Sequence, residues 1–150
     1  MNTNIKGSEL TAVLAEVQPI SQGAGTVTTS WINISQFYSL LAIISTGIMG
    51  ASGTVDAKLQ QATSAAGAGA KDVTGKAITQ LQQAASGSNV HALINLRGQE
   101  LDTNGGFNYV RLSITVGTAA SLIAAKLLGL NPVYMPASAN NDAAVVQVVG

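Results

Sequence analysis

The sequence contains no cysteine and a single histidine, His91. Without cysteine the chain has no disulfides, no thiolate metal ligands and no thiol nucleophile. One histidine with neither a cysteine nor a second histidine cannot complete a usual zinc site. We therefore expect no metal centre, and a fold that depends on its hydrophobic core.

Charge is also scarce. Asp, Glu, Lys and Arg make up 9% of the residues, against about 25% in typical soluble domains. Seven basic and seven acidic residues give a formal net charge of +0, so copies of the chain repel one another little. The basic residues are scattered, and no nucleic-acid partner is expected. These features favour a subunit that associates with itself inside an assembly; the alternative is a small neutral monomer.

Long apolar runs suited to a membrane are missing. Residues 37–49 and 112–130 are the longest runs, and polar side chains interrupt both. A membrane helix needs about 20 mainly apolar residues. The first seven residues lack the charged and then apolar layout of a signal peptide. We expect no membrane partner, and synthesis in the cytoplasm.

Hydrophobic residues nevertheless make up 47% of the chain, and their spacing in residues 105–117 is the clearest signal. From residue 110 to 116 the even positions are apolar, and from residue 107 to 115 the odd positions are polar or aromatic. Successive side chains of a strand point to opposite faces of a sheet, so this pattern predicts a half-buried β-strand. The two sets are Val110, Leu112, Ile114 and Val116, against Phe107, Tyr109, Arg111, Ser113 and Thr115.

Similar patterns predict strands elsewhere. Residues 54–61 alternate most cleanly, with Val55, Ala57 and Leu59 on one face. Residues 38–46 suit a strand buried on both faces, although periodicity does not exclude a helix. Residues 77–83 (Ala77 to Gln83) are ambiguous between strand and helix, and we predict a strand. The remaining predicted strands are 26–35, 90–96, 121–130 and 144–149.

The number and spacing of these strands predict an all-β fold, an antiparallel β-sandwich or jelly-roll-like barrel. We assign residues 27–150 to this sandwich domain and residues 1–26 to a short N-terminal arm, helical or extended. Leu10, Val13, Leu14 and Val17 have helical spacing over residues 9–17, and Pro19 ends that pattern. The arm is either a frayed tail or a segment that docks on a neighbouring subunit.

No residue pattern indicates catalysis. Glu100 and Asp102 are two residues apart beside a predicted turn, where Asp is favoured for local hydrogen bonds. The glycines near Lys71 and Lys76 do not have the spacing of a phosphate-binding loop, and no G-x-S-x-G elbow occurs. We predict no catalytic residues, no cofactor and no enzymatic activity.

Several segments resemble a group of small structural proteins of tailed bacteriophages. The resemblance covers about residue 31 to the C-terminus and excludes residues 1–26. Its motifs are structural and carry over no site residues. They are residues 54–63, 69–73, 75–81, 94–97, 100–102 and 106–111.

The resemblance implies a virion component whose partners are the major capsid protein or other virion proteins. A capsid decoration or cement protein is the first interpretation, and a head–tail connector, collar or tail component is the alternative. Phe107, Tyr109 and Arg111 are the candidate interface residues, because aromatic residues and Arg are enriched at interfaces. Cross-strand stacking is the structural alternative for this trio.

Two other function classes fit a β-rich chain. A secreted carbohydrate-binding or adhesin module calls for exposed aromatic residues and a secretion signal. A small hydrolase on a jelly-roll scaffold calls for a metal triad or an acid pair in a cleft, and the single histidine disfavours it.

Overall fold

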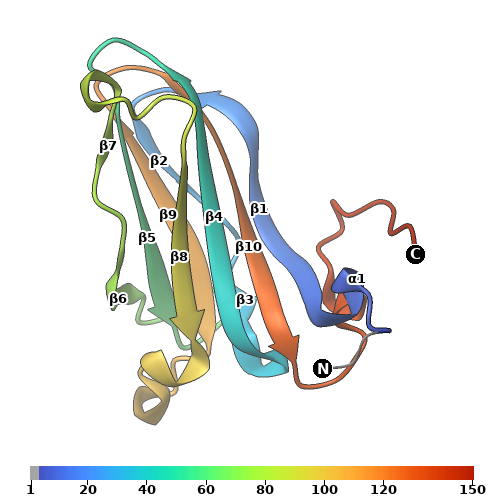
Figure 1. Cartoon of the computed structure of the whole chain (residues 1–150). Helices are drawn as coiled ribbons and strands as arrows, with labels where there is room; N and C mark the ends of the chain where they lie inside the picture. Colours follow the sequence, from blue (N-terminus) through green and yellow to red (C-terminus); the bar gives the residue numbers. More distant parts are fainter. Residues whose placement is uncertain (1–3) are drawn as a thin grey trace.

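Two antiparallel sheets form the protein in the computed structural model, which describes residues 4–150. Figure 1 looks onto sheet A, in which the four strands lie side by side. Its order is β1 (Thr11–Gln22), β10 (Ser121–Pro132), β4 (Phe37–Met49) and β8 (His91–Arg97). Sheet B has the order β2 (Gly25–Thr28), β9 (Tyr109–Gly117), β5 (Thr54–Ala62) and β6 (Lys71–Ala77), with β3 (Ile32–Asn33) beside β9 and β7 (Leu81–Gln82) beside β5.

The strand pairing identifies the sandwich as a jelly roll. The first long strand pairs with the last, β2 pairs with β9, β4 pairs with β8, and β5 pairs with β6. A ribbon paired in this nested way and rolled over itself gives two four-stranded sheets with Greek-key connections. The predicted antiparallel sandwich or jelly-roll-like fold is therefore confirmed.

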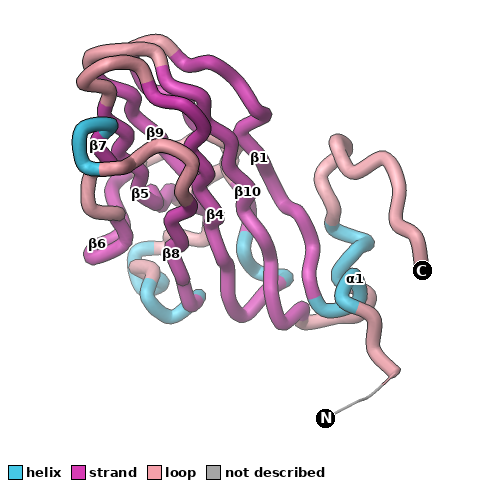
Figure 2. The backbone as a smooth tube through the Cα atoms, turned by 45° about the horizontal axis from the view of Figure 1, so that its top comes forward, coloured by secondary structure: helices cyan, strands magenta, loops and turns pink. Residues whose placement is uncertain are grey.

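Short helical turns occupy several connections, precede the first long strand and follow the last one (Figure 2). α1 (Gly7–Leu10) precedes β1, and the 3-10 turn η5 (Ala137–Asn140) follows β10. The others are η1 (Ile34–Gln36), η2 (Gln83–Ala85), η3 (Gly98–Glu100) and η4 (Thr103–Gly105).

The core lies between the sheets, where the alternating residues of β9 and β5 meet those of sheet A. Val110, Leu112 and Ile114 of β9 are fully buried, as are Val55 and Leu59 of β5. The alternation of residues 105–117 and 54–61 thus predicted both the strands and their inner faces correctly.

The strand at residues 38–46 exists as β4, but its burial differs from the prediction. Leu40, Ala42 and Ile44 face the core, whereas Leu41 and Ile43 on the other side are only partly buried. No layer of the described chain covers that outer side of sheet A. The prediction of a strand buried on both faces is therefore wrong.

The helical alternative for residues 9–17 is wrong beyond Leu10: α1 ends there, and residues 11–17 lie in β1 and pair with β10. A register shift between Val13 and Ala15 marks a β-bulge, which places Leu14 and Ala15 both on the buried side. The buried positions are therefore 12, 14, 15 and 17, so that Leu14 and Val17 are three residues apart, as on one side of a helix. Residues 11–22 thus belong to the sandwich rather than to a separate arm.

Two further strand predictions fail. Residues 144–149 form no strand, and Val146 and Val149 are exposed. The chain instead reaches the edge of β1, where the Asp142 backbone N–H donates to the Val13 carbonyl over 2.7 Å. The strand predicted over residues 77–83 exists only in part: Ala77 ends β6 and Leu81–Gln82 form β7, but residues 78–80 are irregular and Gln83 begins η2.

Candidate functional site

The three predicted interface residues lie on or just before β9, and each is half-buried. The guanidinium carbon of Arg111 is 4.5 Å from the centroid of the Trp31 ring. The Nζ atom of Lys71 is 4.1 Å from the centroid of the Phe107 ring. Phe107 and Arg111 are therefore engaged in cation–π contacts within the chain.

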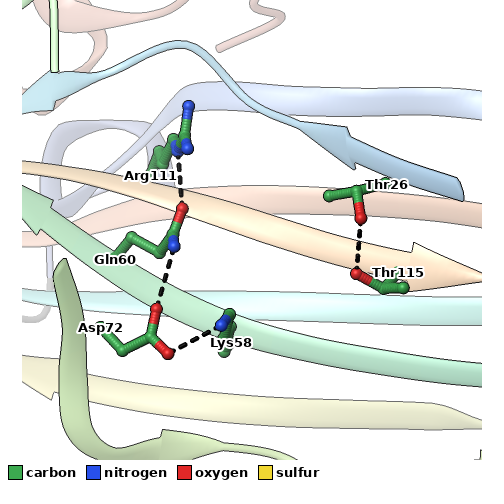
Figure 3. Close-up of polar contacts among 6 residues, drawn as sticks. All are labelled: Thr26, Lys58, Gln60, Asp72, Arg111 and Thr115. Carbon is green, nitrogen blue, oxygen red and sulfur yellow. Dashed lines mark hydrogen bonds and ion pairs between the residues drawn. The ribbon is translucent and has the colours of Figure 1, made fainter. Parts of the chain in front are cut away.

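A chain of hydrogen bonds fixes Arg111 on the outer side of sheet B (Figure 3). Its Nε donates to Gln60 Oε1 over 2.9 Å, and Gln60 Nε2 donates to Asp72 Oδ1 over 2.9 Å. Lys58 Nζ donates to the other oxygen of Asp72 over 2.7 Å. The bonds from Lys58 and Gln60 hold the pKa of Asp72 below its ordinary value. This side of sheet B is thus polar and internally satisfied.

The loop at residues 63–70 covers the aromatic side chains. Gly67 has φ +81°, and a Cβ atom there would be 2.6 Å from the Trp31 indole nitrogen. Gly69, at φ +65°, lies beside the Phe107 ring. The sequence predicted this segment as a loop but gave no sign that its glycines permit close approach to Trp31. We define Trp31, Phe107, Tyr109 and Arg111 as the aromatic cluster.

The acidic and histidine candidates take structural positions. His91 is exposed, and its Nδ1 lies 2.8 Å from Ser45 Oγ. Lys76 binds Glu100 over 2.9 Å, and Lys71 binds Asp102 over 2.6 Å. The Lys76 bond and the Arg97 backbone N–H lower the pKa of Glu100, and the Lys71 bond and the Gly105 backbone N–H lower that of Asp102. Carboxyls held ionised in this way are poor general acids at neutral pH.

Metal ligands do not gather in the part of the chain that the structure describes: no group of three His, Cys, Asp or Glu residues there has the geometry to hold an ion. Among residues 4–150, no helix has the length and hydropathy needed to cross a bilayer.

The outer side of sheet A differs sharply from that of sheet B. Leu93 of β8 and Leu122 of β10 are 58% and 43% exposed on it, beside Leu41 and Ile43 of β4. The other outward residues of β8 are polar: His91, Asn95 and Arg97. Opposite charges occur once near the middle of this outer side, where Lys126 binds Glu16 over 3.0 Å. We call this surface the sheet A face; its main apolar residues are Leu41, Ile43, Leu93, Leu122 and Leu128.

A cavity of about 620 Å³ opens where β4 begins and β8 ends. Tyr38, 67% exposed, lies on its wall with Arg97, Gln99 and Asn131. Within the described residues the Arg97 guanidinium forms no ion pair closer than 4.0 Å. The cavity therefore offers an aromatic ring, amides and a cation to a ligand.

No protein-family model matches the chain, and no curated protein is significantly similar to it in sequence. Solved structures with a similar backbone fold include a chain of Desmodium yellow mottle tymovirus. It is 10% identical to this chain with a TM-score of 0.42, and the aligned region covers 89% of this chain and 94% of that one. A chain of Broad Bean Stain Virus is 8% identical with a TM-score of 0.46, covering 90% and 93%.

The sugar-binding C-terminal domain of EclA is 12% identical with a TM-score of 0.41, covering 82% of this chain and 80% of that domain. Similarities at this level identify no function for this chain. Its jelly-roll architecture rests on its own strand pairing.

Proposed function

We propose that this chain is a non-enzymatic structural protein of a virus particle. The sheet A face carries the proposal, because monomeric soluble proteins rarely leave a contiguous apolar patch of this kind uncovered. The chain also lacks net charge, which otherwise keeps monomers apart. Jelly rolls occur in viral capsid and lectin domains; this part of the argument is an analogy of fold, which does not fix function.

Within the particle, we propose a decoration or cement role on the outer capsid lattice of a tailed bacteriophage. Such a subunit needs no catalysis and gains strength from many copies bound to one shell. The aromatic cluster is the proposed contact with the major capsid protein, since aromatic residues and Arg dominate interface hot spots. Trp31 and Gln60 hold Arg111 in place, so little side-chain entropy is lost on binding.

The decisive measurement is the copy number of the protein relative to the major capsid protein in purified particles. A decoration protein approaches parity with the capsid protein. A ratio far below parity removes the decoration role and leaves the head–tail connector, collar or tail role. Absence of the protein from particles removes the virion proposal altogether.

Binding of the purified chain to capsid shells tests the contact surface. Tyr109→Ala is expected to weaken binding at least tenfold, roughly the loss of 1.4 kcal/mol. Thr74→Ala, an exposed change on β6, is the matched control and should bind normally. Equal binding by both variants would show that the aromatic cluster is not the contact.

A carbohydrate-binding role is the second candidate, and the cavity beside Tyr38 favours it. An exposed aromatic ring can stack on the apolar side of a sugar, and amide and guanidinium groups can bond its hydroxyls or carboxylate. Saturation-transfer NMR with neutral and acidic monosaccharides tests this role. A signal that Tyr38→Ala and Arg97→Ala both abolish supports it; no signal with any sugar rejects it.

A further inference from the structure

The sheet A face combines a protrusion and hollows on opposite sides of β4. Leu93 projects from β8 with 58% of its surface exposed. On the other side of β4, a hollow of about 230 Å³ lies over Ala124 between Pro19 and Ile43. A second hollow of about 300 Å³ continues it toward Ile20 and Leu122. The small side chain of Ala124 leaves this space between larger neighbours.

A two-fold axis running along β4 exchanges the two sides of the face. Leu93 and Lys126 both pair with Ile43, so the axis places Leu93 of each copy opposite the Lys126 end of the hollow in the other. Leu41 and Ile43, on β4 itself, come to lie against their own counterparts. Because an isologous interface uses the same patch on both subunits, it requires this kind of self-complementarity. We propose that the sheet A face binds a second copy of this chain in a two-fold dimer.

The charges on the face are compatible with this partner. Glu16 and Lys126 already bind each other, and the Glu16 side chain is only 17% exposed. Covering a pair that is already made leaves no charge buried without a partner, which is the costly outcome. The central part of the face carries no net charge that would attract a strongly acidic or basic protein. Arg97 lies at the end of β8, toward the rim.

The size of the face sets the expected affinity. Four strands about 4.8 Å apart, with about seven residues each at about 3.4 Å, give a flat footprint of roughly 450 Å² per copy. Side-chain relief makes the accessible area larger, toward the roughly 800 Å² per partner of a standard interface. We therefore expect a dimer that dissociates at micromolar concentrations, about 8 kcal/mol of binding free energy.

Sedimentation equilibrium of the full chain across the micromolar range tests the dimer. The unmodified chain is expected to pass from monomer to dimer, and Leu93→Lys to shift the dissociation constant upward by at least about tenfold. Thr115→Lys adds the same charge to an exposed strand position on sheet B and should leave the equilibrium unchanged. Circular dichroism of both variants checks that the fold is retained.

A cross-link locates the axis, since the chain has no cysteine of its own. Leu41→Cys, beside the proposed axis, is expected to give covalent dimers with a short bis-maleimide, and Thr115→Cys is not. A monomer at every concentration, an open-ended polymer, or a dimer insensitive to Leu93→Lys overturns the proposal.

The proposed dimer and the proposed virion role both rest on the sheet A face, but either can be refuted without the other. Copy number in particles tests the role, and sedimentation of the isolated chain tests the dimer.

Discussion

Deletion of residues 1–24 is expected to abolish folding, because β1 is part of the core. Leu14 and Val17 are 7% and 5% exposed, and burial of such side chains contributes about 1.5–3 kcal/mol each. Ala12 and Ala15, both 1% exposed, add about 1 kcal/mol each. The lost burial of about 5–8 kcal/mol is comparable with the whole stability of a typical domain, about 5–15 kcal/mol. The deletion also leaves one edge of β10 without its hydrogen-bond partners.

Urea unfolding followed by circular dichroism and by the fluorescence of Trp31, the single tryptophan, measures the effect. Leu14→Ala gives a graded version, with an expected loss of about 2–4 kcal/mol. Gln18→Ala, exposed on the same strand, is the control and should change stability by less than about 0.5 kcal/mol. A truncated chain that unfolds cooperatively at the midpoint of the full chain would refute this reasoning and restore the idea of a separable arm.

Three further predictions follow from the outer side of sheet B. Gly67→Ala should lower the free energy of unfolding by about 1–3 kcal/mol and change the fluorescence emission of Trp31. Gly75→Ala should lower it less, because Gly75 also has a positive φ, +73°, but has open space around it. Equal losses of stability in the two variants would exclude the Trp31 contact as the cause. Arg111→Lys should lower the urea midpoint by about 0.5–1 kcal/mol, because a lysine lacks the planar group that meets Trp31 and Gln60; an unchanged midpoint contradicts this. The pKa values of Asp72, Glu100 and Asp102 are lowered in the folded chain, so their ionised forms stabilise the fold. This stabilisation is complete above the unfolded pKa of about 4 and is lost as the pH falls from there through the lower folded pKa. Melting temperatures should therefore fall below about pH 4, less steeply in Asp72→Asn, and a melting temperature independent of pH there would contradict the ion pairs.

The periodicity of the residues was enough to predict the fold class and the inner faces of β5 and β9. A strand repeats every two residues, so the alternation of residues 54–61 and 105–117 carried enough local information to identify β5, β9 and their buried side chains. Composition likewise indicated a chain with little charge. The same alternation predicted that Tyr109 and Arg111 share the outer side of sheet B, and the interface role of Phe107, Tyr109 and Arg111 stays a prediction.

Contacts between segments far apart in the chain, which no local pattern contains, determine how these strands pair and what covers them. The β-bulge at Leu14 gives the sequence a spacing that resembles a helix. The extra residue is accommodated because β1 pairs with β10, more than 100 positions away in the chain. Residues 144–149 are rich in valine, as strands often are, but they pair with no strand, and a strand forms only where another supplies hydrogen bonds. The approach of Trp31 to Arg111 and Gly67, and the open sheet A face, likewise arise from contacts between distant segments. Local periodicity fixes which way a side chain points, but what lies opposite it depends on the order in which the strands pair.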